Sequence, residues 1–255
     1  EATSPVKIPF EKTKLSNGLN VWVVKQNELP IVSMNMVINA GGALESADKS
    51  GVASMTASML NQGTTTRSAL EIANGLQAIG ASVGAGASFD NTTISMQTLT
   101  KNLDTALGFF ADQVMNPAFP ETEFKSAKGR LLNSFRQRKA SATAVAGVVY
   151  DKVLYGDQVY GRQLSGDEKT VAAMTRDDLV NFYSANYRPN NSTLIVVGDV
   201  QAADLVGPLQ QLRELLVDRR LLGLEHRRGL RVPASHPISG PESLYRAPWT
   251  MSSHG

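Results

Sequence analysis

The sequence predicts an α+β fold in which a mostly antiparallel sheet carries its helices on one face. Three observations support this prediction. The expected elements follow the order β-β-β-α-α-β-β-α-α-α-α-β, and no change in composition divides the chain before about residue 200. The content of 42% hydrophobic and 19% charged residues is enough for a packed core and excludes wholesale disorder.

The first three expected elements are strands. Asn17-Gly18 lies between two extended segments within residues 10–25, and this dipeptide is the strongest short signal for a hairpin turn. Residues 31–39 have the pattern of a third strand, which ends at Gly41-Gly42.

Two helices and a strand pair are expected next. Apolar residues recur on one helical face from Ser50 until Gly63, and a second helix runs from Ser68, a good N-cap, to Gly80. Residues 81–88 and 91–99 have strand patterns. The first of these strands is small and glycine-rich, which suits close approach by another strand but is equally a packing or twist device.

The rest of the predicted domain is helical until its last strand. Pro120 is well placed near a helix start. The expected helices span residues 102–115, 120–140, 143–155 and 175–187, and the last strand spans residues 191–198.

The sequence changes after Val200. Lysine disappears, and arginine pairs precede a stretch rich in Pro, Ser and Gly. A helix is plausible over residues 202–222, whereas residues 223–255 fit neither periodicity. We therefore expect one domain over residues 10–222 and a disordered or non-native tail over residues 223–255.

Charge and composition exclude several functions. Residues 1–200 carry 18 basic and 18 acidic side chains, and such a neutral body argues against a nucleic-acid-binding face. No apolar stretch approaches the ~18 residues that a membrane crossing needs. The chain starts with Glu1 rather than Met, which is compatible with signal-peptide removal and with a periplasmic or otherwise exported location.

The usual zinc ligands and the usual general base are missing from most of the chain. There is no Cys, and His226, His236 and His254 all lie in the tail at spacings that match no metal motif. The first 225 residues therefore contain neither His nor Cys.

Five motifs in order carry a family resemblance. They are residues 15–21, 39–42, 51–64, 154–162 and 187–199. With these motifs, residues 10–200 resemble the N-terminal domain of the pitrilysin/insulinase-type zinc metallopeptidases. In that family the first helix carries His-x-x-Glu-His, in which two His ligate zinc and the Glu activates water.

The resemblance places four substitutions at the family's chemical positions. The His-x-x-Glu-His places hold Ser54, Ala57 and Ser58, and the distal Glu ligand maps to Ser134. Neutral hydroxyls are poor zinc ligands, and Ala cannot act as a base. A serine nucleophile would need a base, and only a lysine is conceivable, although nothing places one on that face. We expect no catalytic residue, no bound metal and no peptidase activity of the chain alone.

The resemblance also implies a role. Some family members pair a metal-bearing half with a metal-free half across a chamber, so the chain resembles a non-catalytic partner of a zinc-bearing subunit, with zinc only in that partner. In active members the peptide adds as a strand to the edge matching Gly84, Ala85, Gly86 and Ala87. The family's Asn at the start of that edge is Gly84 here. The Arg and Tyr that help to bind substrate in the second domain of metal-free subunits have no counterpart in this chain.

Two other hypotheses stay open. One is a functioning zinc endopeptidase of the same family, which would need ligands that the sequence does not supply. The other is a truncated, nonfunctional fragment of a two-domain subunit. A domain face left without its second domain would be exposed and apolar, so self-association is a fair expectation.

Six smaller features have ordinary interpretations. Asp177-Asp178 and Asp167-Glu168 fit first-turn charges that complement a helix dipole. Arg162 and Arg188 match family landmarks and are interpreted as structural. The patterns at Asn91 and Asn191 match the glycosylation acceptor, which often arises by chance.

Overall fold

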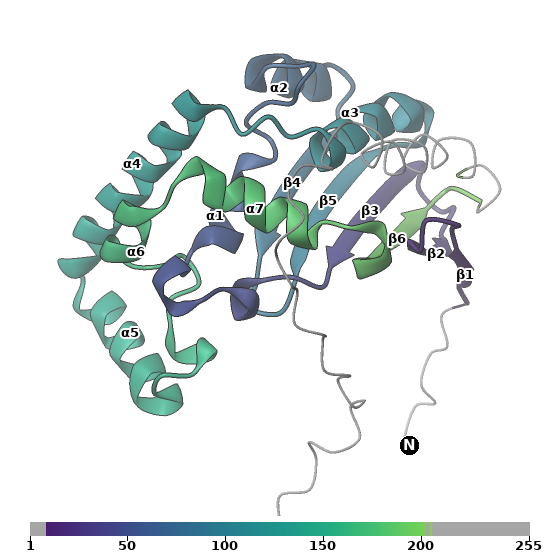
Figure 1. Cartoon of the computed structure of the whole chain (residues 1–255). Helices are drawn as coiled ribbons and strands as arrows, with labels where there is room; N and C mark the ends of the chain where they lie inside the picture. The colour runs from purple at the N-terminus through teal and green to yellow at the C-terminus, as the bar shows by residue number, and fades with distance from the viewer. Residues whose placement is uncertain (1–8, 202–204, 206–255) are drawn as a thin grey trace, which may run out of the picture.

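The computed structural model describes residues 9–201 and residue 205 (Figure 1). Its strands are β1 (Glu11–Lys14), β2 (Asn20–Lys25), β3 (Ile31–Ile38), β4 (Ser82–Ala87), β5 (Thr92–Leu99) and β6 (Ser192–Gly198). Its α-helices are α1 (Val52–Met59), α2 (Ala69–Ala78), α3 (Leu103–Met115), α4 (Glu121–Lys139), α5 (Ala142–Tyr155), α6 (Glu168–Ala173) and α7 (Arg176–Asn186).

The six strands form one sheet in the order β1-β2-β6-β3-β5-β4. Each neighbouring pair is antiparallel except β2 and β6, which are parallel. The predicted α+β class and mostly antiparallel sheet are therefore confirmed. Strand β6, the last one among the described residues, lies in the middle of the sheet, between β2 and β3.

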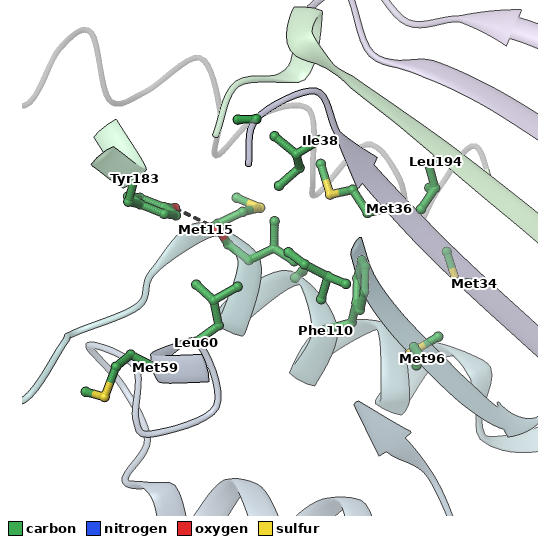
Figure 2. Packing of buried hydrophobic residues seen from close by; sticks show 14 of the residues in the cluster. Met34, Met36, Ile38, Met59, Leu60, Met96, Phe110, Met115, Tyr183 and Leu194 are labelled. Carbon is green, nitrogen blue, oxygen red and sulfur yellow. Dashed lines mark hydrogen bonds between the residues drawn. The ribbon is translucent and has the colours of Figure 1, made fainter. Parts of the chain in front are cut away.

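The core lies on one face of the sheet. Side chains alternate between buried and partly exposed along β3 and β6, as expected when one face is covered. In Figure 2, Met34, Met36 and Leu194 of the sheet face Phe110 of α3. Figure 1 shows the helices gathered on this same face, as the sequence predicts.

Local signals explain where several elements begin. At the first hairpin, Gly18 has a φ of +91°, and the Leu19 amide donates to Asn17 Oδ1 at 3.0 Å. Ser68 forms a capping box with Glu71 at the start of α2, and Thr175 forms one with Asp178 at the start of α7.

One helix is absent from the sequence prediction. Helix α6 has only six residues, too few for an apolar period to be visible, and Asp167 caps it in a box with Thr170. Apart from Leu205, the expected helix over residues 202–222 and the tail over residues 223–255 lie outside the described residues.

Candidate functional site

The four positions of interest lie on two helices that contact each other. Helix α1 packs against α4 and also against β4 and α7. It starts after Gly51, whose φ of +101° lies in the left-handed region. A Cβ at this residue would lie 2.7 Å from the carbonyl oxygen of Ser165, so the approach of these two segments requires glycine.

A carboxylate that was not singled out in the sequence caps α1. Glu45 is buried, and its two carboxylate oxygens accept from the backbone amides of Gly51 and Ala53. Burial raises the pKa of Glu45, although these two bonds and the Arg162 guanidinium act in the opposite direction. The only sequence signal would have been an acidic residue shortly before a helix start.

Arg162 connects this cap to a later part of the chain. Its Nη1 donates to the carbonyl oxygen of Glu45 at 3.2 Å, across 117 residues of sequence. This contact agrees with the structural role expected from the sequence.

The positions of the metal-binding motif present no charged or basic group. Ser54 is half-buried, and Ser58 is exposed one turn later on α1. The Ser58 hydroxyl donates to the carbonyl oxygen of Met55 at 2.8 Å. Ala57 is only 1% exposed, so its methyl group belongs to the core.

The distal position has a similar environment. Ser134 is half-buried on α4, and its hydroxyl donates to the carbonyl oxygen of Leu131 at 2.7 Å. Ser58 and Ser134 therefore each use their proton within their own helix, the bond that serine commonly makes inside helices.

This donor set does not fit zinc. Zinc in proteins takes imidazole, thiolate or carboxylate ligands, and the four positions offer three neutral hydroxyls and a methyl group. Among residues 9–201 and 205, no group of three or more His, Cys, Asp or Glu side chains could hold a metal ion. The nearby carboxylate of Glu45 already accepts from the backbone amides of Gly51 and Ala53.

Strand β4 is an edge of the sheet and lies beside α1. Its only strand partner in the described part of the chain is β5. The Ser88 amide donates to the Asn91 carbonyl at 2.7 Å, and backbone groups alternate in direction along an antiparallel strand. The backbone groups of Val83, Ala85 and Ala87 therefore face away from β5.

Two glycines leave space above this strand. A Cβ added at Gly86 would meet no atom within 4 Å, and one at Gly84 would meet only the Ser95 hydroxyl, at 3.7 Å. The predicted edge residues Gly84, Ala85, Gly86 and Ala87 lie on this edge strand, where Gly86 is exposed and the other three are partly exposed.

The β4–β5 hairpin is fixed to the segment that precedes α1. The amide of Gly42 donates to Ser88 O at 3.0 Å, and the amide of Ala43 donates to Phe89 O at 2.8 Å. From the other side, the Tyr160 hydroxyl donates to Asp90 Oδ1 at 2.8 Å, and its ring contacts Phe89. These bonds hold β4 in place relative to α1, and no short motif predicts them.

The other residues singled out in the sequence have structural contacts. Asp167 and Asp178 are members of helix capping boxes. Arg188 donates to the carbonyl oxygens of Ala185 and Ser184 at the end of α7. The side-chain amide nitrogen of Asn191 donates to two backbone carbonyls.

Comparison with known proteins identifies similar sequences. The family model described as Insulinase (Peptidase family M16) matches residues 21–166, and the model described as Peptidase M16 inactive domain matches residues 173–214. An uncharacterized zinc protease of Rickettsia felis is 27% identical over 207 residues, which cover 81% of this chain and 50% of the relative. The mitochondrial-processing peptidase subunit beta of Bos taurus is 25% identical, over 76% of this chain and 39% of the relative.

Solved structures of peptidase family M16 are similar to this chain as well. A peptidase M16 inactive domain from Pseudomonas fluorescens has a TM-score of 0.77 and 28% identity, covering 82% of this chain and 51% of that one. The periplasmic protease PqqL from Escherichia coli shares the fold at a TM-score of 0.73 and 24% identity, covering 82% of this chain and 24% of that one. The chain spans about half the length of the Rickettsia relative. No helix within the described residues is long and apolar enough to cross a membrane.

Proposed function

Since the chain belongs to the insulinase family of peptidases, peptidase family M16, as its motifs predict, we propose that it is a non-catalytic member that completes the peptide-binding chamber of a zinc-bearing subunit. One observation carries this proposal. The positions for metal and base hold Ser54, Ala57, Ser58 and Ser134, whereas the neighbouring strand β4 is an edge of the sheet among the described residues.

The edge strand can act without a metal. Pairing an extended peptide with a sheet edge uses backbone amides and carbonyls, and it needs no particular side chain of the protein. The outward backbone groups of Val83, Ala85 and Ala87 offer such a row. Peptide binding is therefore the part of the family's function that these residues support.

The same proposal assigns the zinc ion, the hydrolysis step and the cellular location. Zinc and peptide hydrolysis belong to the partner subunit, and this chain contributes part of the chamber wall. The relatives named as zinc proteases and the periplasmic protease PqqL support a role in proteolysis and an exported, periplasmic location.

An affinity pull-down from extract of the native cell tests the partnership. We expect mass spectrometry to identify a homologue with an intact His-x-x-Glu-His, and we expect zinc and peptidase activity in the complex only. Recovery of the chain without such a homologue would contradict the proposal. Stoichiometric zinc and activity in the isolated chain would favour the zinc endopeptidase hypothesis instead.

A variant of the edge strand tests peptide pairing within that complex. Ala85→Pro removes one outward amide and leaves the β5 ladder intact, because proline is tolerated on edge strands. We expect this variant to keep the partner subunit and to raise the KM for peptides, whereas Ala85→Ser keeps wild-type kinetics. If Ala85→Pro and Ala85→Ser give the same KM for peptides, the peptide does not pair with the edge of β4.

A further inference from the structure

Strands β2 and β6 differ from the rest of the sheet because they are apolar on both faces. Their apolar runs span residues 21–24 and residues 194–197 without interruption. Strands β3 and β5 instead carry polar side chains on the face away from the core, among them Ser33, Asn35 and Gln97. β2 and β6 are also the one parallel pair in the described sheet. Parallel strands with continuous apolar runs are typical of sheets that are covered on both faces.

Only one face of this pair has a cover in the described part of the chain. The side chains at positions 21, 23, 194 and 196 are buried in the core. Figure 1 shows the described helices gathered on that face. On the opposite face, four apolar side chains remain exposed to solvent in part, and they form the β2–β6 patch: Trp22, Val24, Ile195 and Val197.

The β2–β6 patch has the width of a single helix. Trp22 lies opposite Ile195 in the parallel register, and Val24 lies opposite Val197. Two strands ~4.8 Å apart span roughly 10 Å with their side chains, which is close to the ~10–12 Å diameter of a helix. On the next strand the neighbour of Ile195 is the polar Asn35. A second sheet would extend over such polar side chains, so the dimensions favour a helix.

Two lysines line the other side of the β2–β6 patch. Lys12 is the register partner of Trp22, and its Nζ lies 4.8 Å from the centre of the Trp22 ring. Lys14 follows on the same face of β1, and neither lysine forms an ion pair within the described residues. Glu11 is the only acidic residue in the six strands, and it lies on the opposite face beside Val23. A second copy would therefore bring no acidic partner for these lysines, whereas a helix with an acidic flank would complement them.

We propose that the β2–β6 patch binds one amphipathic helix of a neighbouring domain outside residues 1–255. The apolar side of that helix lies on the patch, and acidic residues along one flank pair with Lys12 and Lys14. The matched part is 50% of the Rickettsia felis relative, so this relative has enough further sequence for such a domain. The patch lies on the face opposite to α1 and away from the β4 edge, so the proposal does not rest on the proposed function.

Photo-cross-linking in the native cell tests the occupant. The full chain carries a photoreactive amino acid in place of Ile195, and mass spectrometry identifies the segment that becomes attached to it. We expect one segment from outside residues 1–255, with apolar residues at intervals of three and four and acidic residues beside them. The matched control carries the same group in place of Leu70, an exposed apolar residue on α2, and should not capture this segment.

Three cross-linking results would overturn the proposal, provided that circular dichroism shows both labelled chains folded. One is attachment to a second copy of this chain. Another is attachment to a segment that lacks the helical spacing. The third is attachment at position 195 that is no greater than attachment at position 70.

A synthetic peptide of the captured segment tests the role of the charges. The chain contains two tryptophans, so Trp249→Phe leaves Trp22 as the only fluorescent reporter. We expect the peptide to shift the emission of Trp22 to shorter wavelength. Lys12→Glu together with Lys14→Glu should raise the dissociation constant about tenfold or more. Lys169→Glu, at an exposed position on α6, should leave it unchanged. Equal constants for the two charge variants, or an unchanged Trp22 spectrum, would contradict the proposal.

Discussion

A single buried carboxylate, Asp112, joins the loop after α1 to the end of α3. Its Oδ2 accepts from the hydroxyls of Thr64 and Thr66 at 2.7 and 2.9 Å and from Arg67 Nη1 at 2.6 Å. Its Oδ1 accepts from Asn116 Nδ2 at 3.1 Å. Burial by itself would raise the pKa of Asp112, but these four bonds together hold it below its ordinary value.

This environment predicts a pH-dependent stability. The lowered pKa means that the contribution of Asp112 is present above the unfolded value of 3.8 and is lost as pH falls through the folded pKa. We expect Asp112→Asn to lower the free energy of unfolding by about 1–3 kcal/mol at neutral pH, because it leaves donors without a charged acceptor.

Urea unfolding between neutral and acidic pH measures this effect. The difference between the two proteins should narrow below the ordinary aspartate pKa, where the wild-type carboxylate becomes protonated. Asp104→Asn, at an exposed position on α3, should change stability little at any pH. A difference between wild type and Asp112→Asn that does not vary with pH would contradict this account.

Single residues also show how far sequence reasoning reaches. The substitutions at Ser54, Ala57, Ser58 and Ser134 can be found from the motif, because a motif fixes its residues by spacing. Glu45 and Tyr160 could not be found in this way. Their roles depend on contacts across the fold, such as the Tyr160 bond to Asp90 over 70 residues of sequence.

At the scale of elements, helices α1 and α4 contact each other although their positions for metal ligands and base hold Ser and Ala. Positions 54 and 58 are one turn apart on α1 and share a face. We therefore predict that Ser54→His, Ser58→His and Ser134→Glu together create a zinc site. Ala57 stays unchanged, because it is buried.

Zinc content after dialysis and thermal unfolding measure the outcome. The triple variant should retain about one zinc per chain. Zinc at 100 times its dissociation constant should stabilise it by about 2.7 kcal/mol, whereas the wild type should show neither effect. The control replaces Ser134→Glu by Ser134→Gln, which keeps the size and loses the charged ligand, and it should bind more weakly. Equal zinc binding by both variants would argue that α4 does not face the two histidines.

Most elements could be predicted because their signals are local. Asn17-Gly18 sets a turn, and Ser68 and Thr175 cap helices through bonds to residues three positions later. Helix α6 was missed because six residues are too few to show an apolar period.

At the scale of the whole molecule, the order of strands in the sheet could not be predicted from the sequence. Strand β6 enters between β2 and β3 and is parallel to β2, and the connection from β2 to β6 contains β3, β4, β5 and the helices α1 to α7. Hydrophobic patterns identify β6 as a strand with one buried face but do not specify its neighbours. Because β6 joins β2 to β3, the sheet cannot form as one unit without it.

The central position of β6 predicts different effects for two truncations. A chain that ends at residue 191 lacks β6, so β2 and β3 lose their shared neighbour and the core loses the buried Leu194 and Val196. We expect this chain to show no cooperative unfolding by circular dichroism. A chain that ends at residue 222 keeps the whole predicted domain and should match the full chain within about 0.5 kcal/mol.

A full-length control separates the loss of β6 from the loss of length. Val196→Asp keeps every residue of the chain but buries an unpaired charge in the middle strand, so it should also abolish or severely weaken cooperative unfolding. If the chain ending at residue 191 unfolds cooperatively, the sheet can close without β6. If the chain ending at residue 222 is strongly destabilised, residues 223–255 contribute to the folded domain, and the predicted domain boundary is wrong.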